Sequence, residues 1–245
     1  MKEVQCSQCP LRRLSLFVEN SHAEVAYVQS VKQRELHLDA GQLLIYEGQA
    51  SGPVYTLLLG FAFRFKTLHD GRRQILGFLM AGDYIGVQQN MGEMACAGVM
   101  TLTDSIFCVF DRNSVWELHQ NSPALGFSVT WLIALEASRV DDCLLSVGRR
   151  NAEERVASLL LLFFRHARAL QKREEAGGVP FPLTQQHIAD ALGLSLVHTN
   201  KTLRRLALRG LYLLRDGYLT IADSKALAAV ANLHNDGDAP KRPLV

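Results

Sequence analysis

The sequence contains no long apolar run and no export signal. Its first nine residues, MKEVQCSQC, include no apolar stretch, and the longest such stretch, Val156–Phe164, is far too short to span a bilayer. Five cysteines, an odd number, indicate a reducing compartment rather than a disulfide framework. These absences predict a cytoplasmic protein that does not cross a membrane.

A strong overall charge is missing as well. The formal net charge is only +2, so an interaction with nucleic acid must depend on a local cluster of cations. Apolar residues make up 48% and charged residues 20% of the chain, which is ordinary for a globular protein. The 245 residues are enough for two domains that each have a core.

The segment 183–211, LTQQHIADALGLSLVHTNKTLRRLALRGL, predicts two short helices around a tight turn. Thr184 is a good N-cap for the first helix, and Gly193 suits its end because glycine tolerates the left-handed conformation. Ser195 can cap the second helix, which we expect to reach about Arg209. This pattern is typical of a helix-turn-helix, whose second helix enters the major groove.

The second helix of this segment is amphipathic. Thr199, Leu203 and Leu206 recur at helical spacing and should face the core. The opposite face carries a stripe of residues suited to an anionic partner: Val197, Asn200, Lys201 and Arg204. Because the segment holds four lysines and arginines and one acid, its local charge of +3 suits phosphate neutralisation. The alternative is an ordinary pair of packed surface helices.

A short hairpin is predicted directly after the second helix. Leu211–Leu214 and Tyr218–Ile221 flank Asp216 and Gly217, the favoured pair for a two-residue hairpin turn. The hairpin extends the helix-turn-helix to a winged helix. Residues 171–182, which are charged and then rich in glycine and proline, predict a loop before it.

Between about residues 32 and 116, apolar residues recur at every second position, which is the spacing of β-strands. Six short segments have this pattern: 35–38, 43–47, 54–59, 62–67, 74–79 and 105–110. Many short strands at even spacing indicate an antiparallel barrel or jelly roll. Ahead of them, Ser21 and Glu24 are placed as the capping box of a short helix.

A long helix is predicted over residues 122–146, and it would span roughly 35 Å. Its apolar residues approximate a heptad seam that Glu136 interrupts: Val129, Ile133, Val140, Cys143 and Val147. Symmetric pairs are the commonest oligomers, so the seam favours a homodimer. The alternative is a helix that is buried in its own domain.

Together these elements predict an α+β chain in four parts. The predicted parts are an N-terminal antiparallel β-roll of the jelly-roll kind over 1–121, a dimerisation helix over 122–150, a winged helix-turn-helix over 151–234 and a disordered tail over 235–245.

The same parts, in this order, resemble the CRP/FNR transcription regulators. The stretches GQLLIYEGQASGPVYTLLLGFAFRF and DGRRQILGFLMAGDYIG resemble their cyclic-nucleotide-binding-like β-roll, and NAEERVA at 151–157 is similar to the FNR branch. The resemblance implies a homodimeric regulator, not an enzyme, that binds a near-palindromic site in double-stranded DNA. It also implies contact with RNA polymerase and control by a signal that the β-roll senses.

The resemblance argues against cyclic AMP as that signal. Family members that bind cyclic nucleotides hold the ribose and phosphate with a Gly-Glu pair and an Arg-Ser pair. Here these positions are Gly86-Val87 and Ala95-Cys96. Without the arginine, the phosphate loses a charge-assisted hydrogen bond.

FNR-like members hold an oxygen-labile iron–sulfur cluster with four cysteines. Cys6, Cys9 and Cys108 match three of them, and the remaining position falls on Ser15, a poor replacement for a thiolate. Cys6 and Cys9 form a single C-x-x-C, which is not a full metal site. Three interpretations of the signal stay open. The first is an iron–sulfur cluster with an incomplete set of cysteine ligands, the second is redox chemistry of the thiols, and the third is an unknown ligand in an apolar pocket. The signal itself could be redox state, oxygen or nitric oxide.

Family geometry also implies which residues contact DNA. These are Thr184, Gln185, Ser195, Val197, His198, Asn200, Lys201, Arg204 and Arg205. The family's common Glu, with an Arg four residues later, is replaced here by Val197 and Lys201. Asparagine pairs with adenine, lysine with guanine and valine with the thymine methyl, so we expect a different operator sequence.

Two other classes of protein compete with this interpretation. A cupin-like metal enzyme on a similar jelly roll needs closely spaced histidines, whereas His37 and His69 stand alone. A ligand-binding protein could use the helix-turn-helix for protein contacts. The retained stripe of Asn200, Lys201 and Arg204 argues against that second alternative.

Overall fold

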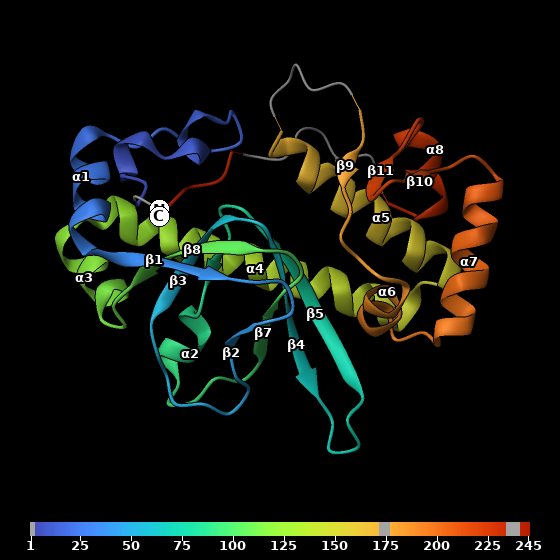
Figure 1. The fold of residues 1–245 in the computed structure, drawn as a ribbon, viewed down its shortest axis with the longest axis horizontal. Helices are drawn as coiled ribbons and strands as arrows, with labels where there is room; N and C mark the ends of the chain where they lie inside the picture. The colour runs from blue at the N-terminus through green and yellow to red at the C-terminus, as the bar shows by residue number, and fades with distance from the viewer. Residues whose placement is uncertain (1–2, 172–176, 234–240) are drawn as a thin grey trace. The chain divides into compact units, whose positions relative to one another are not determined.

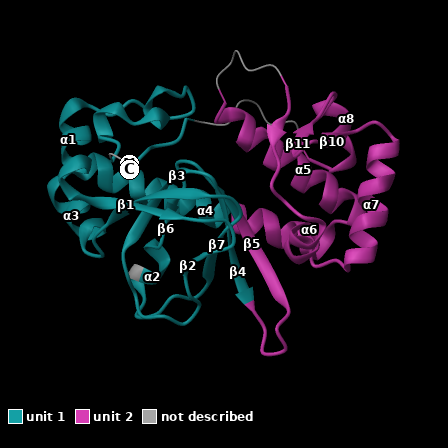
Figure 2. Cartoon of the chain, in the orientation of Figure 1, with its two compact units in different colours: residues 1–66, 78–138, 240–245 teal, residues 67–77, 139–239 magenta. Residues whose placement is uncertain are grey.

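The computed structural model forms two compact units, which Figure 2 shows in different colours. The structure describes residues 3–171, 177–233 and 241–245. Unit 1 comprises residues 1–66, 78–138 and 240–245, and unit 2 comprises residues 67–77 and 139–239. This division differs from the predicted one, because it falls inside the long helix and assigns the hairpin at 67–77 to unit 2.

The first half of the chain consists mainly of strands, with short helices before, between and after them (Figure 1). Its elements are η1 (Cys6–Gln8), η2 (Pro10–Arg13), α1 (His22–Val31), β1 (Lys32–Leu38), β2 (Leu43–Ile45), β3 (Val54–Leu59), β4 (Phe61–Thr67), β5 (Arg73–Met80), β6 (Tyr84–Ile85), α2 (Val87–Met91), β7 (Gly98–Thr101), β8 (Ser105–Phe110) and α3 (Ser114–Asn121). The predicted capping box starts α1, since the Ser21 hydroxyl accepts from the Glu24 N–H and the Glu24 carboxylate accepts from the Ser21 N–H.

The strands form two four-stranded sheets, in the orders β1-β8-β3-β6 and β2-β7-β4-β5. The pairings of β1, β3 and β8 and those of β2, β4 and β7 are antiparallel, which confirms the predicted β-roll. One core cluster consists of strand residues such as Leu57 and Phe107, both fully buried. A second cluster joins strand residues to Leu118 and Leu125 on the helices that follow.

The long helix α4 extends over Pro123–Arg149. Val129, which the sequence predicted in a dimer seam, is fully buried in the core of unit 1, so that assignment is wrong. Helical periodicity identifies apolar faces, but it cannot tell a face packed on its own domain from a face for a partner. The helix still exposes five large apolar side chains: Phe127, Ile133, Val140, Leu144 and Leu145.

Unit 2 is mainly helical. Its further elements are α5 (Ala152–Ala169), β9 (Val179–Pro180), α6 (Gln185–Leu192), α7 (Leu196–Leu208), β10 (Leu213–Arg215), β11 (Tyr218–Thr220) and α8 (Ser224–Val230). The α5 helix packs its buried face against α7 and α8. In the described part of the chain, no helix is long and apolar enough to span a bilayer.

Two segments predicted without regular structure are ordered elements. Val179–Pro180 lies in the predicted loop but pairs with β11 as the third strand of the wing. Arg242, Leu244 and Val245 lie in the predicted disordered tail, yet each is at most 5% exposed. Both segments make contacts with residues far away in the sequence, which local composition does not reveal. The rest of the predicted tail, up to residue 240, lies outside the described residues.

Candidate nucleic-acid interface and ligand cavity

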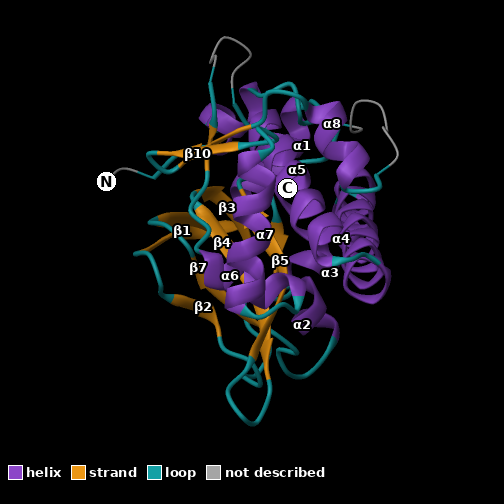
Figure 3. Cartoon of the chain, turned by 90° about the vertical axis from the view of Figure 1, so that its right-hand side faces the viewer, coloured by secondary structure: helices purple, strands orange, loops and turns teal. Residues whose placement is uncertain are grey.

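The first helix of the helix-turn-helix is fixed at both ends by local interactions. The Thr184 hydroxyl accepts a hydrogen bond from the His187 N–H at 3.2 Å, and the Thr184 N–H donates to His187 Nδ1, also at 3.2 Å. Gly193 ends α6 in the left-handed conformation, with a φ of 63°. The predicted caps of this helix are therefore confirmed. Figure 3 shows α6 and α7 as successive helices.

The second helix presents one buried and one exposed face. The Ser195 hydroxyl accepts from the His198 N–H at 3.2 Å and caps α7. Thr199, Leu203 and Leu206 are buried, as their spacing predicted. The side chains left on the surface include most of the predicted DNA-contacting residues: Thr184, Gln185, Ser195, Val197, His198, Lys201, Arg204 and Arg205. The helix can therefore offer cations and an apolar group to one partner.

Asn200 differs from the other residues of the predicted stripe. It is only half-exposed, and its Oδ1 atom is buried with no hydrogen-bond partner among the described residues. It lines a small cavity together with Gln185, Arg204 and Tyr212. Lys201 is thus better placed than Asn200 for a first contact with a base edge.

Two cations at the end of α7 share one carboxylate. Arg205 Nη1 lies 3.3 Å from Glu153 Oε2, and Arg209 pairs with the other oxygen of Glu153. Glu153 is in the first turn of α5, where a carboxylate also interacts favourably with the helix dipole. Arg205, predicted as a phosphate contact, is therefore partly neutralised within unit 2.

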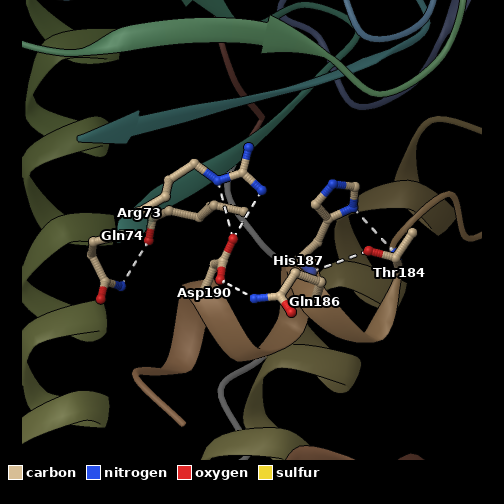
Figure 4. Close-up of polar contacts among 7 residues, drawn as sticks. Arg73, Gln74, Thr184, Gln186, His187 and Asp190 are labelled. Carbon is tan, nitrogen blue, oxygen red and sulfur yellow. Dashed lines mark hydrogen bonds and ion pairs between the residues drawn. The ribbon is translucent and has the colours of Figure 1, made fainter. Parts of the chain in front are cut away.

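The hairpin between β4 and β5 contacts the helix-turn-helix inside unit 2 (Figure 4). Arg73 Nε and Nη2 both donate to Asp190 Oδ2, at 3.1 and 2.9 Å. Gln186 donates to the other oxygen of Asp190 at 2.6 Å, and Gln74 donates to the Ala191 carbonyl at 3.0 Å. The acid of the helix-turn-helix is thereby neutralised, so it opposes an anionic partner less than the sequence suggested.

The same environment keeps His187 neutral. Burial lowers its pKa, the nearby Arg73 guanidinium lowers it further, and Asp190 acts in the opposite direction. A neutral ring is needed because Nδ1 accepts the hydrogen bond from the Thr184 N–H. Sequence reasoning missed Arg73, Gln74 and Glu153, because no local pattern links them to the helix-turn-helix.

The wing follows α7 as predicted. β10 and β11 pair antiparallel, and Asp216 and Gly217 connect them with φ values of 52° and 78°. Two successive positive φ angles are those of a type I′ turn, which suits the twist of a hairpin. The unit is a winged helix-turn-helix.

Unit 1 contains a cavity at the positions where cyclic-nucleotide-binding relatives hold their ligand. Val87, Ala95 and Cys96 line it, together with Arg64 and Glu136. Arg64, the one cation in the cavity wall within the described ranges, is held by protein groups. Its Nη2 lies 2.7 Å from Glu136 Oε1, and its Nη1 donates to the Gln88 side-chain oxygen at 2.9 Å. The cavity thus offers a guanidinium that is already paired.

The three cysteines predicted as cluster ligands all lie in unit 1. Cys6 is buried at the start of η1, Cys9 follows η1, and Cys108 is half-buried on β8. Burial raises the pKa of Cys6, and it raises the pKa of Cys108 to about 12 despite the nearby charge of Lys32. The Lys32 ammonium donates to Glu35 Oε1 at 2.7 Å and to the Val4 carbonyl at 2.8 Å.

These thiols do not form a ready-made cluster site. Ser15, at the position of the missing ligand, is exposed. Within the described ranges, no group of three histidine, cysteine, aspartate or glutamate side chains could hold a metal ion. The predicted iron–sulfur cluster stays a prediction.

A winged helix-turn-helix with exposed cations, in one chain with an antiparallel β-roll, defines a DNA-binding transcription regulator. Residues 154–230 match the Crp-like helix-turn-helix domain, and residues 35–122 match the cyclic nucleotide-binding domain. The chain belongs to the CRP/FNR family of transcription regulators, as the resemblance in its sequence implied.

Individual relatives agree with this assignment. The transcriptional activator protein FnrL of Cereibacter sphaeroides is 30% identical over 240 residues, which cover 96% of this chain and 95% of the relative. The nitrogen fixation regulation protein FixK of Bradyrhizobium diazoefficiens is 28% identical over 230 residues, 92% and 93% of the two chains. The structure of FixK2 from Bradyrhizobium japonicum shares the fold, with a TM-score of 0.72 at 24% identity over 84% of this chain and 98% of that one.

Proposed function

We propose that this regulator binds a near-palindromic operator as a homodimer and acts on transcription through RNA polymerase. The observation that carries the proposal is the exposed face of α7, where Val197, Lys201 and Arg204 are free of the core. Phosphate contacts supply affinity and base-edge contacts supply sequence choice. The names of FnrL as a transcriptional activator and of FixK as a regulation protein support a role at promoters. We place this activity in the cytoplasm.

The exposed apolar side chains of α4 support the homodimer. Phe127 and Leu144 are 70% and 71% exposed, and Ile133 and Val140 are about 40% exposed. Exposed apolar side chains in this number on one helix indicate an interface with a partner. A second copy of the chain can supply that partner, because a two-fold axis brings the same apolar face of both copies together. Ile133, Val140, Cys143 and Val147 stay in the predicted seam. Leu144 is added to it, and Val129 is removed.

Light scattering tests the dimer. Leu144→Asp places like charges across a two-fold seam and should shift the protein from dimer to monomer at micromolar concentration. Leu59→Asp makes the same change at an exposed position in unit 1 and should leave the mass unchanged. A dimer that tolerates Leu144→Asp would show that α4 does not form the interface.

We infer that cyclic AMP is not the effector. Val87, Ala95 and Cys96 replace the polar groups that hold a cyclic nucleotide in the family, and Arg64 is paired with Glu136. The remaining candidates are redox chemistry at Cys6 and Cys9, an iron–sulfur cluster that rearranges the cysteines, and an apolar ligand. An ultraviolet–visible spectrum of protein purified without oxygen separates the cluster from the other two candidates, because a cluster absorbs in the visible and thiols do not.

Selection from random DNA duplexes tests the proposed function as a whole. Two-fold symmetry predicts enrichment of a near-palindrome whose half-sites lie about one helical turn apart. The selection is made with both oxidised and reduced protein. If neither form enriches a palindrome, the protein is not a homodimeric operator-binding regulator.

A further inference from the structure

Residues 241–245, Lys-Arg-Pro-Leu-Val, belong to unit 1, although the chain before them belongs to unit 2. Lys241 is exposed, whereas the four residues after it are buried. We call these five residues the docked segment. Residues 234–240, which join it to unit 2, lie outside the described residues.

A buried ion pair fixes the start of the docked segment. Arg242 Nη2 lies 2.6 Å from Asp83 Oδ1, and the two side chains are 5% and 4% exposed. The same guanidinium donates to the Gly82 carbonyl at 3.2 Å and lies over the ring of Phe17. Asp83 also accepts from the Met80 N–H through its other oxygen, at 2.7 Å, so both carboxylate oxygens have a partner. Removing one partner of such a pair leaves an uncompensated buried charge.

Backbone hydrogen bonds and apolar packing hold the rest of the segment. The Arg242 N–H donates to the Leu16 carbonyl, and the Val18 N–H donates to the Arg242 carbonyl, both at 2.9 Å. Further along, the buried Thr56 hydroxyl donates to the main-chain oxygen of Val245 at 2.6 Å. Three interactions that also serve in peptide recognition are therefore present: strand-like pairing at Arg242, its buried ion pair, and the packing of Val245 in a core cluster of unit 1.

We propose that the docked segment is an intramolecular ligand of unit 1, and that its docking keeps unit 2 ordered for DNA binding. The segment adds a further covalent connection between the units, beyond α4 and the β4–β5 strands. A DNA-binding unit with fewer accessible orientations loses less entropy when it binds an operator. Release of the segment should therefore weaken operator binding without altering the recognition helix.

The docking site is connected to the cavity of unit 1. Asp83 directly precedes β6, and Tyr84 of that strand lines the cavity. Val87 and Leu132 also line the cavity, and they belong to the core cluster that contains Val245. A rearrangement of the cavity wall would shift both anchors of the segment. By reciprocity, docking and occupancy of the cavity influence each other.

Hydrogen exchange of the full chain tests the docking itself. In the wild type, the amides of Arg242 and Val18 should be protected. Arg242→Gln should speed their exchange by about tenfold or more. Lys241→Gln removes the same charge from the exposed neighbour and should leave exchange unchanged. Fast exchange in the wild type, or unaltered exchange in Arg242→Gln, would overturn the docked segment.

Operator affinity tests the coupling, and this part depends on the proposed function. Arg242→Gln should bind the selected operator about fivefold or more weakly, while amides of α6 and α7 keep wild-type protection. Equal affinity of Arg242→Gln and the wild type would overturn the coupling. A wild type that binds no operator would overturn the proposed function, whereas the exchange result would still decide whether the segment docks.

Discussion

Three cations show two different uses of charge in the two units. Unit 1 buries cations in pairs, Lys32 with Glu35 at 3% and 4% exposure and Arg242 with Asp83 at 5% and 4%. Unit 2 leaves Lys201 exposed on α7. A buried charge must be neutralised within the protein, whereas an exposed charge stays available to an anionic partner. Lys32 and Arg242 therefore support the fold of unit 1, whereas Lys201 of unit 2 faces solvent and is available to a partner.

The largest effect is expected where a buried pair of unit 1 is broken. Glu35→Ala leaves the Lys32 ammonium buried without its carboxylate, and it should lower the free energy of unfolding by about 3–5 kcal/mol. Urea denaturation followed by circular dichroism measures the loss.

The double variant Lys32→Met with Glu35→Leu removes both charges and should recover most of that stability. Glu19→Ala removes an exposed carboxylate and should have little effect. If Glu35→Ala destabilises the protein no more than Glu19→Ala, the buried pair does not support unit 1.

Removing an exposed cation of unit 2 should affect binding rather than stability. Lys201→Ala should weaken operator binding by about 1–3 kcal/mol and relax the preference at one base pair of each half-site. Binding to single-base operator variants measures both effects. Lys225→Ala, which removes an exposed lysine of α8, serves as the control. A uniform loss on all sequences would assign Lys201 to phosphate rather than to a base.

His187 provides a smaller, pH-dependent test, because it is a titratable group of unit 2 that the fold keeps neutral. Its pKa is lowered in the folded state, so the unfolded chain binds more protons as the pH falls below about 6.5. Stability should therefore fall from about pH 6.5 downward and level off below the folded pKa. Thermal melts at several pH values measure the difference between the wild type and His187→Gln.

The variant His187→Gln keeps a residue that suits the capping box but does not titrate. The stability of His187→Gln should therefore lack the fall below about pH 6.5 that protonation of His187 causes in the wild type. Identical pH profiles for the two proteins would mean that the bond from the Thr184 N–H to the His187 ring is not linked to protonation.

The smallest effect is expected where unit 2 pairs its own cations. Glu153→Gln frees Arg205 and Arg209, and it should strengthen binding to DNA of any sequence by about 0.2–1 kcal/mol, as for an exposed ion pair. Glu154→Gln removes the same charge from the next residue and keeps its capping contact with Asn151. Salt titration measures the affinity of both variants for random DNA. An increase in Glu153→Gln that exceeds the increase in Glu154→Gln is due to the release of the two arginines, because both variants lose one negative charge.

Local sequence was sufficient to predict the helix-turn-helix and the two-stranded hairpin that follows it. The caps at Thr184, Ser195 and Gly193 act within four residues, and the Asp216-Gly217 turn is set by its own backbone preferences. Capping and turn preferences depend on residue type and spacing, so they can be inferred from local sequence. The family resemblance then added the order of the parts and the class of function.

Tertiary structure decided which groups meet across long stretches of chain. The sequence determined that α4 is long and apolar, but only packing showed that Val129 faces the core while Leu144 remains exposed. It likewise could not reveal that Arg242 pairs with Asp83, since the two residues are 159 positions apart. Capping and turn rules depend on neighbours in the chain, whereas burial and ion pairing depend on neighbours in space. The sequence therefore determined the helix-turn-helix and the hairpin after it. The tertiary structure decided which charges and apolar faces stay exposed and can contact a partner.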